Sequence, residues 1–210
     1  KILSILPVKK DYIKNKNLPF KKIKGKTLLE HSINSSLNSK LITHTLVSTS
    51  SSKVINFCKK KFSSFNITFY KRPKNFDKSL KKFSDILTSS LKYFEKKTLI
   101  KPDLIVYINT HVIRSDVKHI DDAIKTLVLR KFNTVFSVNK IIDPIFKIQS
   151  NDFLLLNKGR FDNLDYNNES YYISDNSIVV SNYNSVKNKS IFKKNFGFVE
   201  TNSNKLKKII

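Results

Sequence analysis

Short apolar runs alternate with amphipathic stretches along most of the chain, and this alternation limits the possible folds more than any other feature of the sequence. Residues 2–6 (ILSIL) have the apolar character of a buried strand. A capping box (TLLE) follows at residues 27–30, and Leu29, Ile33 and Leu37 recur there at helical spacing. Repeated strand-helix-strand units of this kind form a mostly parallel sheet with helices on both faces. The sequence therefore predicts a doubly wound α/β domain.

The remaining elements extend this pattern and then depart from it. The predicted strands are residues 45–49, 67–70, 104–108, 134–138 and 196–200, and the predicted helices lie over residues 54–62, 80–94 and 117–127. After Pro144 the pattern changes to short alternating strands at residues 145–149, 171–173 and 177–181, separated by turns rich in Asn and Asp. We therefore predict a single domain over residues 1–210, with a β-rich arm or insertion at about residues 141–190.

The formal net charge of +24 is compatible with two classes of protein. A nucleic-acid-binding protein gathers Lys and Arg on one face to neutralise phosphates. Here the lysines run along the whole chain, only four of the forty basic residues are arginines, and frequent Lys, Asn, Ile and Phe indicate an A/T-rich coding bias. Scattered surface lysines are therefore favoured. Nucleic-acid binding stays open as an alternative because residues 59–62 and 69–72 place basic and aromatic side chains together.

The single cysteine, Cys58, indicates a reducing compartment. It lies in an apolar helical pattern and is expected to be a buried thiol. No apolar run approaches the roughly 20 residues of a membrane span, and residues 2–8 lack the features of a signal peptide. We expect a cytoplasmic protein without a membrane partner. The missing initiator Met and the abrupt end at residues 208–210 lead us to expect trimmed termini.

Polar segments follow the predicted strands in a characteristic order. Their sequences are PVKKDYIK at residues 7–14, KIKGKTLL at 22–29, LVSTS at 46–50, RP at 72–73, YINTHVIR at 107–114, VFSV at 135–138 and YISDNSI at 172–178. In order and spacing the chain resembles the acylneuraminate (CMP-sialic acid) and CMP-deoxyoctulosonate synthetases, a family of sugar-activating cytidylyltransferases. That family has PARGGSKGIPxKN, PLGGKPLL, VVSTD, RP, LQPTSPLR, VFSV and YRENGAI at the corresponding places.

The resemblance implies a Rossmann-like nucleotidyltransferase fold whose β-rich arm joins two subunits into a homodimer. It also implies a reaction in which the anomeric hydroxyl of an acidic 2-keto sugar attacks the α-phosphorus of CTP. The sugar would be like sialic acid or deoxyoctulosonate, the products would be a CMP-sugar and pyrophosphate, and Mg²⁺ would assist. The expected role is surface-glycan biosynthesis, such as that of lipopolysaccharide.

Carried over by position, the resemblance implies a nucleotide-binding set. Its members are Lys9, Lys14, Asn17, Lys26 and Arg72. Lys9, which is also a candidate catalytic residue, replaces the family's arginine, and a lysine lacks the planar fork that grips two phosphate oxygens. Residues 10–13 replace the paired glycines and the Ser and Lys of the family loop. A solvated basic turn is therefore the alternative interpretation of this loop.

A second set of residues is implied for the sugar. Its members are Asn109, Thr110, Arg114 and Arg160. His111 replaces a serine of the family and is a candidate general base, because a pKa near neutrality suits that role. The alternative interpretation of His111 is a packed or solvated residue.

The metal ligands implied by the resemblance are Glu200 and Asp85. Glu200 stands where the family has the aspartate of its V-D-T motif, and Asp85 matches an acidic position of the long helix. The acid of V-S-T-D is replaced by Ser50. These losses, with those of the glycines, leave open a catalytically impaired member that keeps the fold and the dimer.

Overall fold

The computed structural model describes residues 1–11, 16–77, 82–111, 117–141, 143–149, 152–157, 171–193 and 195–201. Its centre is a seven-stranded sheet with the strand order β11-β7-β10-β6-β1-β4-β5. The strands are β1 (Ile2–Val8), β4 (His44–Thr49), β5 (Ile67–Lys71), β6 (Leu104–Ile108), β7 (Thr134–Ile141), β10 (Tyr171–Asn182) and β11 (Phe196–Glu200). All neighbouring pairs are parallel except those of β10, which runs antiparallel to β6 and β7. The mostly parallel sheet predicted from the sequence is confirmed.

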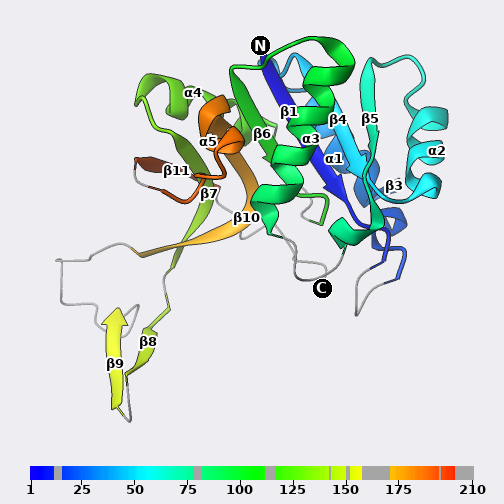
Figure 1. The fold of residues 1–210 in the computed structure, drawn as a ribbon. Helices are drawn as coiled ribbons and strands as arrows, with labels where there is room; N and C mark the ends of the chain where they lie inside the picture. Colours follow the sequence, from blue (N-terminus) through cyan, green and yellow to red (C-terminus); the bar gives the residue numbers. More distant parts are fainter. Residues whose placement is uncertain are drawn as a thin grey trace.

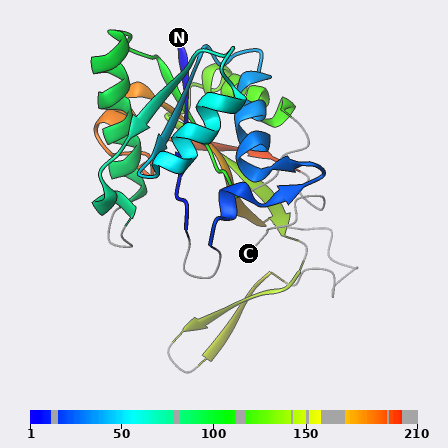
Figure 2. The ribbon, with the colours of Figure 1, turned by 90° about the vertical axis from the view of Figure 1, so that its right-hand side faces the viewer.

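Helices cover both faces of this sheet (Figures 1 and 2). They are α1 (Leu28–Leu37), α2 (Ser52–Lys61), α3 (Phe83–Thr98), α4 (Lys118–Leu129) and α5 (Tyr183–Lys187). α3 and α5 lie on one face, and α1, α2 and α4 lie on the other. This arrangement confirms the predicted Rossmann-like α/β class.

The core consists of two apolar clusters, one on each face of the sheet. Because side chains alternate along a strand, Leu6 and Val8 of β1 pack toward α1, α2 and α4, whereas Leu3 and Ile5 pack toward α3 and α5. Cys58 of α2 belongs to the first cluster and is fully buried, and burial raises the pKa of its thiol to about 12. The expected buried thiol is thus confirmed.

Shorter elements shape the loops near the first helix. They are the 3-10 helices η1 (Leu18–Phe20) and η2 (Lys74–Asp77) and the strands β2 (Lys22–Ile23) and β3 (Lys26–Thr27). The predicted capping box begins α1: Glu30 N–H donates to Thr27 Oγ1 at 3.1 Å, and Thr27 N–H donates to Glu30 Oε2 at 2.7 Å. These two bonds satisfy main-chain donors that the first turn of a helix leaves unpaired.

Within the predicted arm, the structure describes a hairpin and a strand of the central sheet. Strands β8 (Ile145–Gln149) and β9 (Asp152–Asn157) form a separate antiparallel hairpin that projects from the body (Figures 1 and 2). The two strands predicted at residues 171–173 and 177–181 are instead one strand, β10, whose pairing with β7 shifts register between Ser174 and Val179. β10 belongs to the central sheet. Among the described helices, none is long and apolar enough to cross a membrane.

Candidate functional site

The parallel strands β1, β4, β5 and β6 end at one edge of the sheet, and their exits carry most of the predicted site residues. Ligands of open α/β sheets bind at this carboxyl edge. At the exits of these four strands the described structure has two groups of polar side chains: one around Asp77, at the exits of β1, β4 and β5, and one at the exit of β6.

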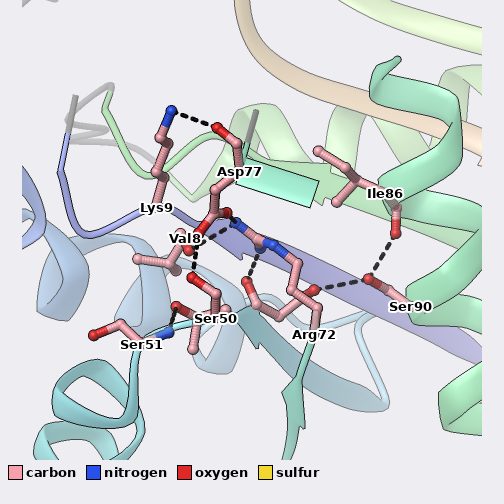
Figure 3. Close-up of polar contacts among 10 residues, drawn as sticks. Val8, Lys9, Ser50, Ser51, Arg72, Asp77, Ile86 and Ser90 are labelled. Atoms are coloured by element: carbon pink, nitrogen blue, oxygen red, sulfur yellow. Dashed lines mark hydrogen bonds and ion pairs between the residues drawn. The ribbon is translucent and has the colours of Figure 1, made fainter. Parts of the chain in front are cut away.

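The first group, here called the Asp77 cluster, consists of Lys9, Ser50, Arg72 and Asp77 (Figure 3). Arg72 Nη2 donates to Asp77 Oδ1 at 2.6 Å, and Ser50 Oγ donates to Asp77 Oδ2. Lys9 Nζ donates to the main-chain oxygen of Asp77 at 2.7 Å. η2 is thereby tied to the exits of three neighbouring strands.

Arg72 is the most buried member of this cluster, with 4% of its surface exposed. Its Nη1 donates to the carbonyl oxygen of Ser48, and its Nη2 also donates to that of Val8 at 3.1 Å. Its Nε is buried without a hydrogen-bond partner among the described residues. Both terminal nitrogens of Arg72 therefore make hydrogen bonds within the protein itself.

The other predicted nucleotide-binding residues are Asn17, Lys26 and Lys14. Asn17 is exposed at φ 54°, a left-handed conformation that Asn tolerates better than most residues, and its N–H donates to Asp11 Oδ1 at 3.0 Å. Lys26 is exposed in β3, directly before α1. Lys14 lies outside the described residues. The structure thus brings Lys9 and Arg72 together around Asp77, and it leaves Asn17 and Lys26 at the surface.

The exit of β6 is the second polar group. Asn109 Nδ2 donates to the main-chain oxygen of Asn176 at 2.9 Å, and its Oδ1 accepts from the N–H of His111 at 2.9 Å. Thr110 is 1% exposed, and its hydroxyl has no hydrogen-bond partner among the described residues. Burial lowers the pKa of His111, which favours the neutral imidazole. Arg114 and Arg160 lie outside the described residues.

A cavity of about 500 Å³ opens beside Asn176, between the start of α3 and the sheet. Four aromatic side chains dominate its lining: Phe83, Tyr107, Phe136 and Phe192. The rings of Phe83 and Tyr107 meet edge to face at 4.6 Å, and those of Phe136 and Phe192 stack at 5.6 Å. A largely apolar cavity with a few polar groups at its rim is typical of small-molecule sites.

The predicted metal ligands do not come with a carboxylate cluster. Asp85 Oδ1 accepts from Lys189 Nζ at 2.6 Å, and Glu200 is exposed at the end of β11. Over the described ranges, no three His, Cys, Asp or Glu side chains gather where they could hold a metal ion. These residues therefore do not form a metal site by themselves, since Mg²⁺ at a nucleotide takes one or two carboxylates and draws its remaining ligands from phosphates and water.

A further carboxylate, Asp175, is held by hydroxyl groups near the same edge. Ser137 and Ser177 donate to its Oδ1, and Thr201 Oγ1 donates to its Oδ2 at 2.6 Å. Burial by itself raises the pKa of Asp175, but the hydrogen bonds from these three side chains and from the N–H of Ser177 outweigh it and hold the pKa below its usual value. Asp175 therefore joins β7, β10 and the end of β11.

The aromatic residues that suggested nucleic-acid binding pack inward. Phe62 is buried in the apolar cluster that faces α1, α2 and α4, and Phe69 packs against that cluster. Tyr70 packs against the cluster on the other face of the sheet. A single-stranded nucleic acid needs exposed rings on which its bases can stack. These positions do not provide such rings.

The sheet order and the helices on both faces define an α/β fold of the nucleotidyltransferase type. CMP:2-keto-3-deoxy-manno-octonic acid synthetase complexed with CTP shares this fold at a TM-score of 0.64 and 11% identity, over 96% of this chain and 90% of that one. HddC from Yersinia pseudotuberculosis has a TM-score of 0.61 and 13% identity, over 96% and 90%. A 4-diphosphocytidyl-2C-methyl-D-erythritol synthase has a TM-score of 0.63 and 9% identity, over 90% and 77%.

The sequence profile of the cytidylyltransferase family matches residues 12–184, which is most of the chain. The chain therefore belongs to the cytidylyltransferase family, and the resemblance identified from the strand exits is confirmed. Comparison with curated protein sequences found no match.

Two residues of the edge had no assigned role in the sequence analysis. Asp77 follows the RP motif by only a few residues, yet it is the shared partner of the Asp77 cluster. Asp175 lies in the segment that resembles YRENGAI and is bound by three hydroxyl side chains. Asp77 and Asp175 could have been singled out from the sequence, because each is an acidic residue in or near a motif of a chain that has few acidic residues.

Proposed function

We propose that the chain transfers the cytidylyl group of CTP to the anomeric hydroxyl of an acidic 2-keto sugar, as a step in surface-glycan synthesis. The observation that carries this proposal is the family match over residues 12–184. The hydroxyl oxygen attacks the α-phosphorus, the bond to the bridging oxygen of pyrophosphate breaks, and the hydroxyl proton passes to a base. The proposed base is His111, whose neutral form is favoured by burial.

We propose that the two polar groups at this edge of the sheet bind different substrates. We assign the triphosphate to the loop after β1, with Lys9, Lys14, Asn17 and Lys26 as cations and donors and with Arg72 behind them. We assign the sugar to the exit of β6, where Asn109 and Thr110 lie near the aromatic cavity. Arg160 completes this set as the partner for the sugar carboxylate, and Arg114 is carried over as a sugar-binding residue, as the resemblance implies.

Magnesium enters this proposal through the resemblance. A protein site for nucleotide-bound Mg²⁺ needs only one or two carboxylates, because phosphate oxygens and water supply the remaining ligands. Glu200, exposed at the end of β11, is the proposed carboxylate. Asp85 would first have to leave Lys189. We place the reaction in the cytoplasm, since a buried free thiol such as Cys58 suits a reducing compartment.

The first prediction is that the protein releases pyrophosphate from CTP and Mg²⁺ in the presence of one acidic 2-keto sugar. The panel contains sialic, legionaminic, pseudaminic and deoxyoctulosonic acids, with methylerythritol phosphate as an acceptor of another class. Pyrophosphate release with a sugar acid, and not with methylerythritol phosphate, supports the proposal. Release with methylerythritol phosphate alone would keep the cytidylyltransferase class and overturn the sugar assignment.

A second candidate function is nucleotide binding without turnover. The observation that favours it is the Asp85–Lys189 ion pair, which occupies a predicted metal ligand. Titration calorimetry with CTP separates the two functions. Heat of binding without pyrophosphate release from any acceptor would support the binding protein.

The second prediction concerns the proposed homodimer. Phe146 and Ile148 of β8 are 63% and 70% exposed, and solvent-exposed apolar side chains on a projecting hairpin are typical of an interface. Replacing both by serine is expected to weaken dimerisation about tenfold or more, measured by light scattering over a dilution series. Phe65→Ser is the control, because Phe65 is 51% exposed outside this hairpin. An unchanged dimer in the double variant would contradict the proposed role of the arm.

A further inference from the structure

Asp77 is the point at which the exits of β1, β4 and β5 are joined. Its two carboxylate oxygens are divided between Arg72, at the end of β5, and Ser50, at the exit of β4. Its main-chain oxygen accepts from Lys9, at the exit of β1. One residue of η2 therefore fixes a side chain from each of three neighbouring strand ends (Figure 3).

Arg72 needs this carboxylate because its charge is buried. The side chain of Arg72 is 3% exposed, whereas that of Asp77 is 21% exposed. A buried cation without a nearby anion is costly. Carbonyl oxygens of Ser48 and Val8 satisfy hydrogen bonds of the guanidinium but do not neutralise it. Among the described residues, Asp77 is the acidic side chain that forms an ion pair with Arg72.

A carboxylate at position 50 could also neutralise the charge of Arg72. The cytidylyltransferase motif VVSTD has an acid at that position, and this chain has Ser50. The hydroxyl of Ser50 already reaches Asp77 Oδ2. A carboxylate attached at position 50 would therefore enter the same space as that of Asp77 and could replace it beside Arg72.

We propose that Asp77 supplies, from η2, the carboxylate that the motif supplies from the exit of β4. Held in place by Arg72, Asp77 then positions Lys9 for the triphosphate through its main-chain oxygen. This inference rests on the proposed function. Asp77 and Ser50 then form an exchangeable pair: one acid is needed at this place, from either position. Two acids at this place would repel each other, and the absence of both would leave Arg72 without its counter-charge.

Three variants test this exchange: Asp77→Ser, Ser50→Asp, and the double variant that carries both changes. Each single variant is expected to raise the Kd for CTP by about tenfold or more, and the double variant is expected to recover most of that loss. The thermal midpoint is expected to follow the same order. Asp152→Ser removes an exposed acid from β9 and serves as the control for net charge.

The outcomes separate this inference from the proposed function. If the double variant shows the summed loss of CTP affinity of the two single variants, Asp77 and Ser50 are not exchangeable, even if the wild-type protein turns over CTP. A Kd for CTP that is unchanged in Asp77→Ser would overturn the positioning role of Asp77 alone. A wild-type protein that binds no CTP would overturn the positioning role together with the proposed function. Recovery of both the thermal midpoint and the Kd supports the inference.

Discussion

Replacing Arg72 by methionine is expected to lower the free energy of unfolding by about 3–5 kcal/mol, because it removes one partner of a buried ion pair. The change leaves Asp77 without its cation and leaves the carbonyl oxygens of Val8 and Ser48 without their donor. Asp77 retains some contact with solvent, so we expect a value near the lower end. Urea unfolding measures the effect as a lower midpoint at an unchanged slope.

The same variant is expected to lose CTP binding. Arg72 and Lys9 share Asp77 as their partner, and Lys9 directly follows β1. Arg72→Lys separates charge from geometry. A lysine keeps the cation but cannot make the forked contacts to Val8, Ser48 and Asp77 at once, so partial recovery of stability is expected.

Arg130→Met is the matched control, because Arg130 is exposed at the end of α4 and its loss should change stability by less than about 0.5 kcal/mol. A destabilisation by Arg72→Met no larger than that of this control would contradict the structural role of the ion pair.

Most strands of the sheet could be predicted from the sequence because their residues are mainly apolar. The predicted bounds of β6, at residues 104–108, and of β11, at residues 196–200, agree with the structure. α5 was missed because five residues are too few to show helical periodicity, although Asn182 caps it through a bond from the N–H of Ser185.

β10 was divided in two because residues 174–176 (SDN) have the composition of a turn. In the fold, Asp175 accepts bonds from Ser137, Ser177 and Thr201, and the strand continues through its register shift. Those donors come from β7, β10 and the residue after β11, so local composition could not reveal them.

That several predicted site residues lie at one edge of the sheet could be predicted, but their contacts could not. Strand exits of a parallel sheet meet at one edge, so Lys9, Arg72 and Asn109 could be placed there from their positions alone. That Arg72 is held by Asp77 depends on η2 turning the chain back toward β4 after Pro73. A short 3-10 helix has no periodicity that sequence patterns can detect.

The other large effect is expected for His111, the proposed general base. His111→Gln should lower kcat by about 10²–10⁴-fold, the usual contribution of a positioned base. The Kd for CTP should be unchanged, because His111 lies at the exit of β6 and the proposed nucleotide set lies around the loop after β1. His119→Gln, the same substitution on α4, is the control and should retain full activity.

The pH profile distinguishes a base from a packing residue. A base must be neutral to accept the hydroxyl proton, so activity falls as the pH falls through the pKa of His111. Burial lowers that pKa in the free protein from its usual value of 6.5, so we expect the acid limb of the kcat/KM profile, which reports groups of the free enzyme, to have its midpoint below 6.5. The limb should disappear in His111→Gln. Persistence of the limb, or a kcat within threefold of the wild-type value, would assign the proton to another group, because an imidazole that only packs does not set the ionisation on which turnover depends.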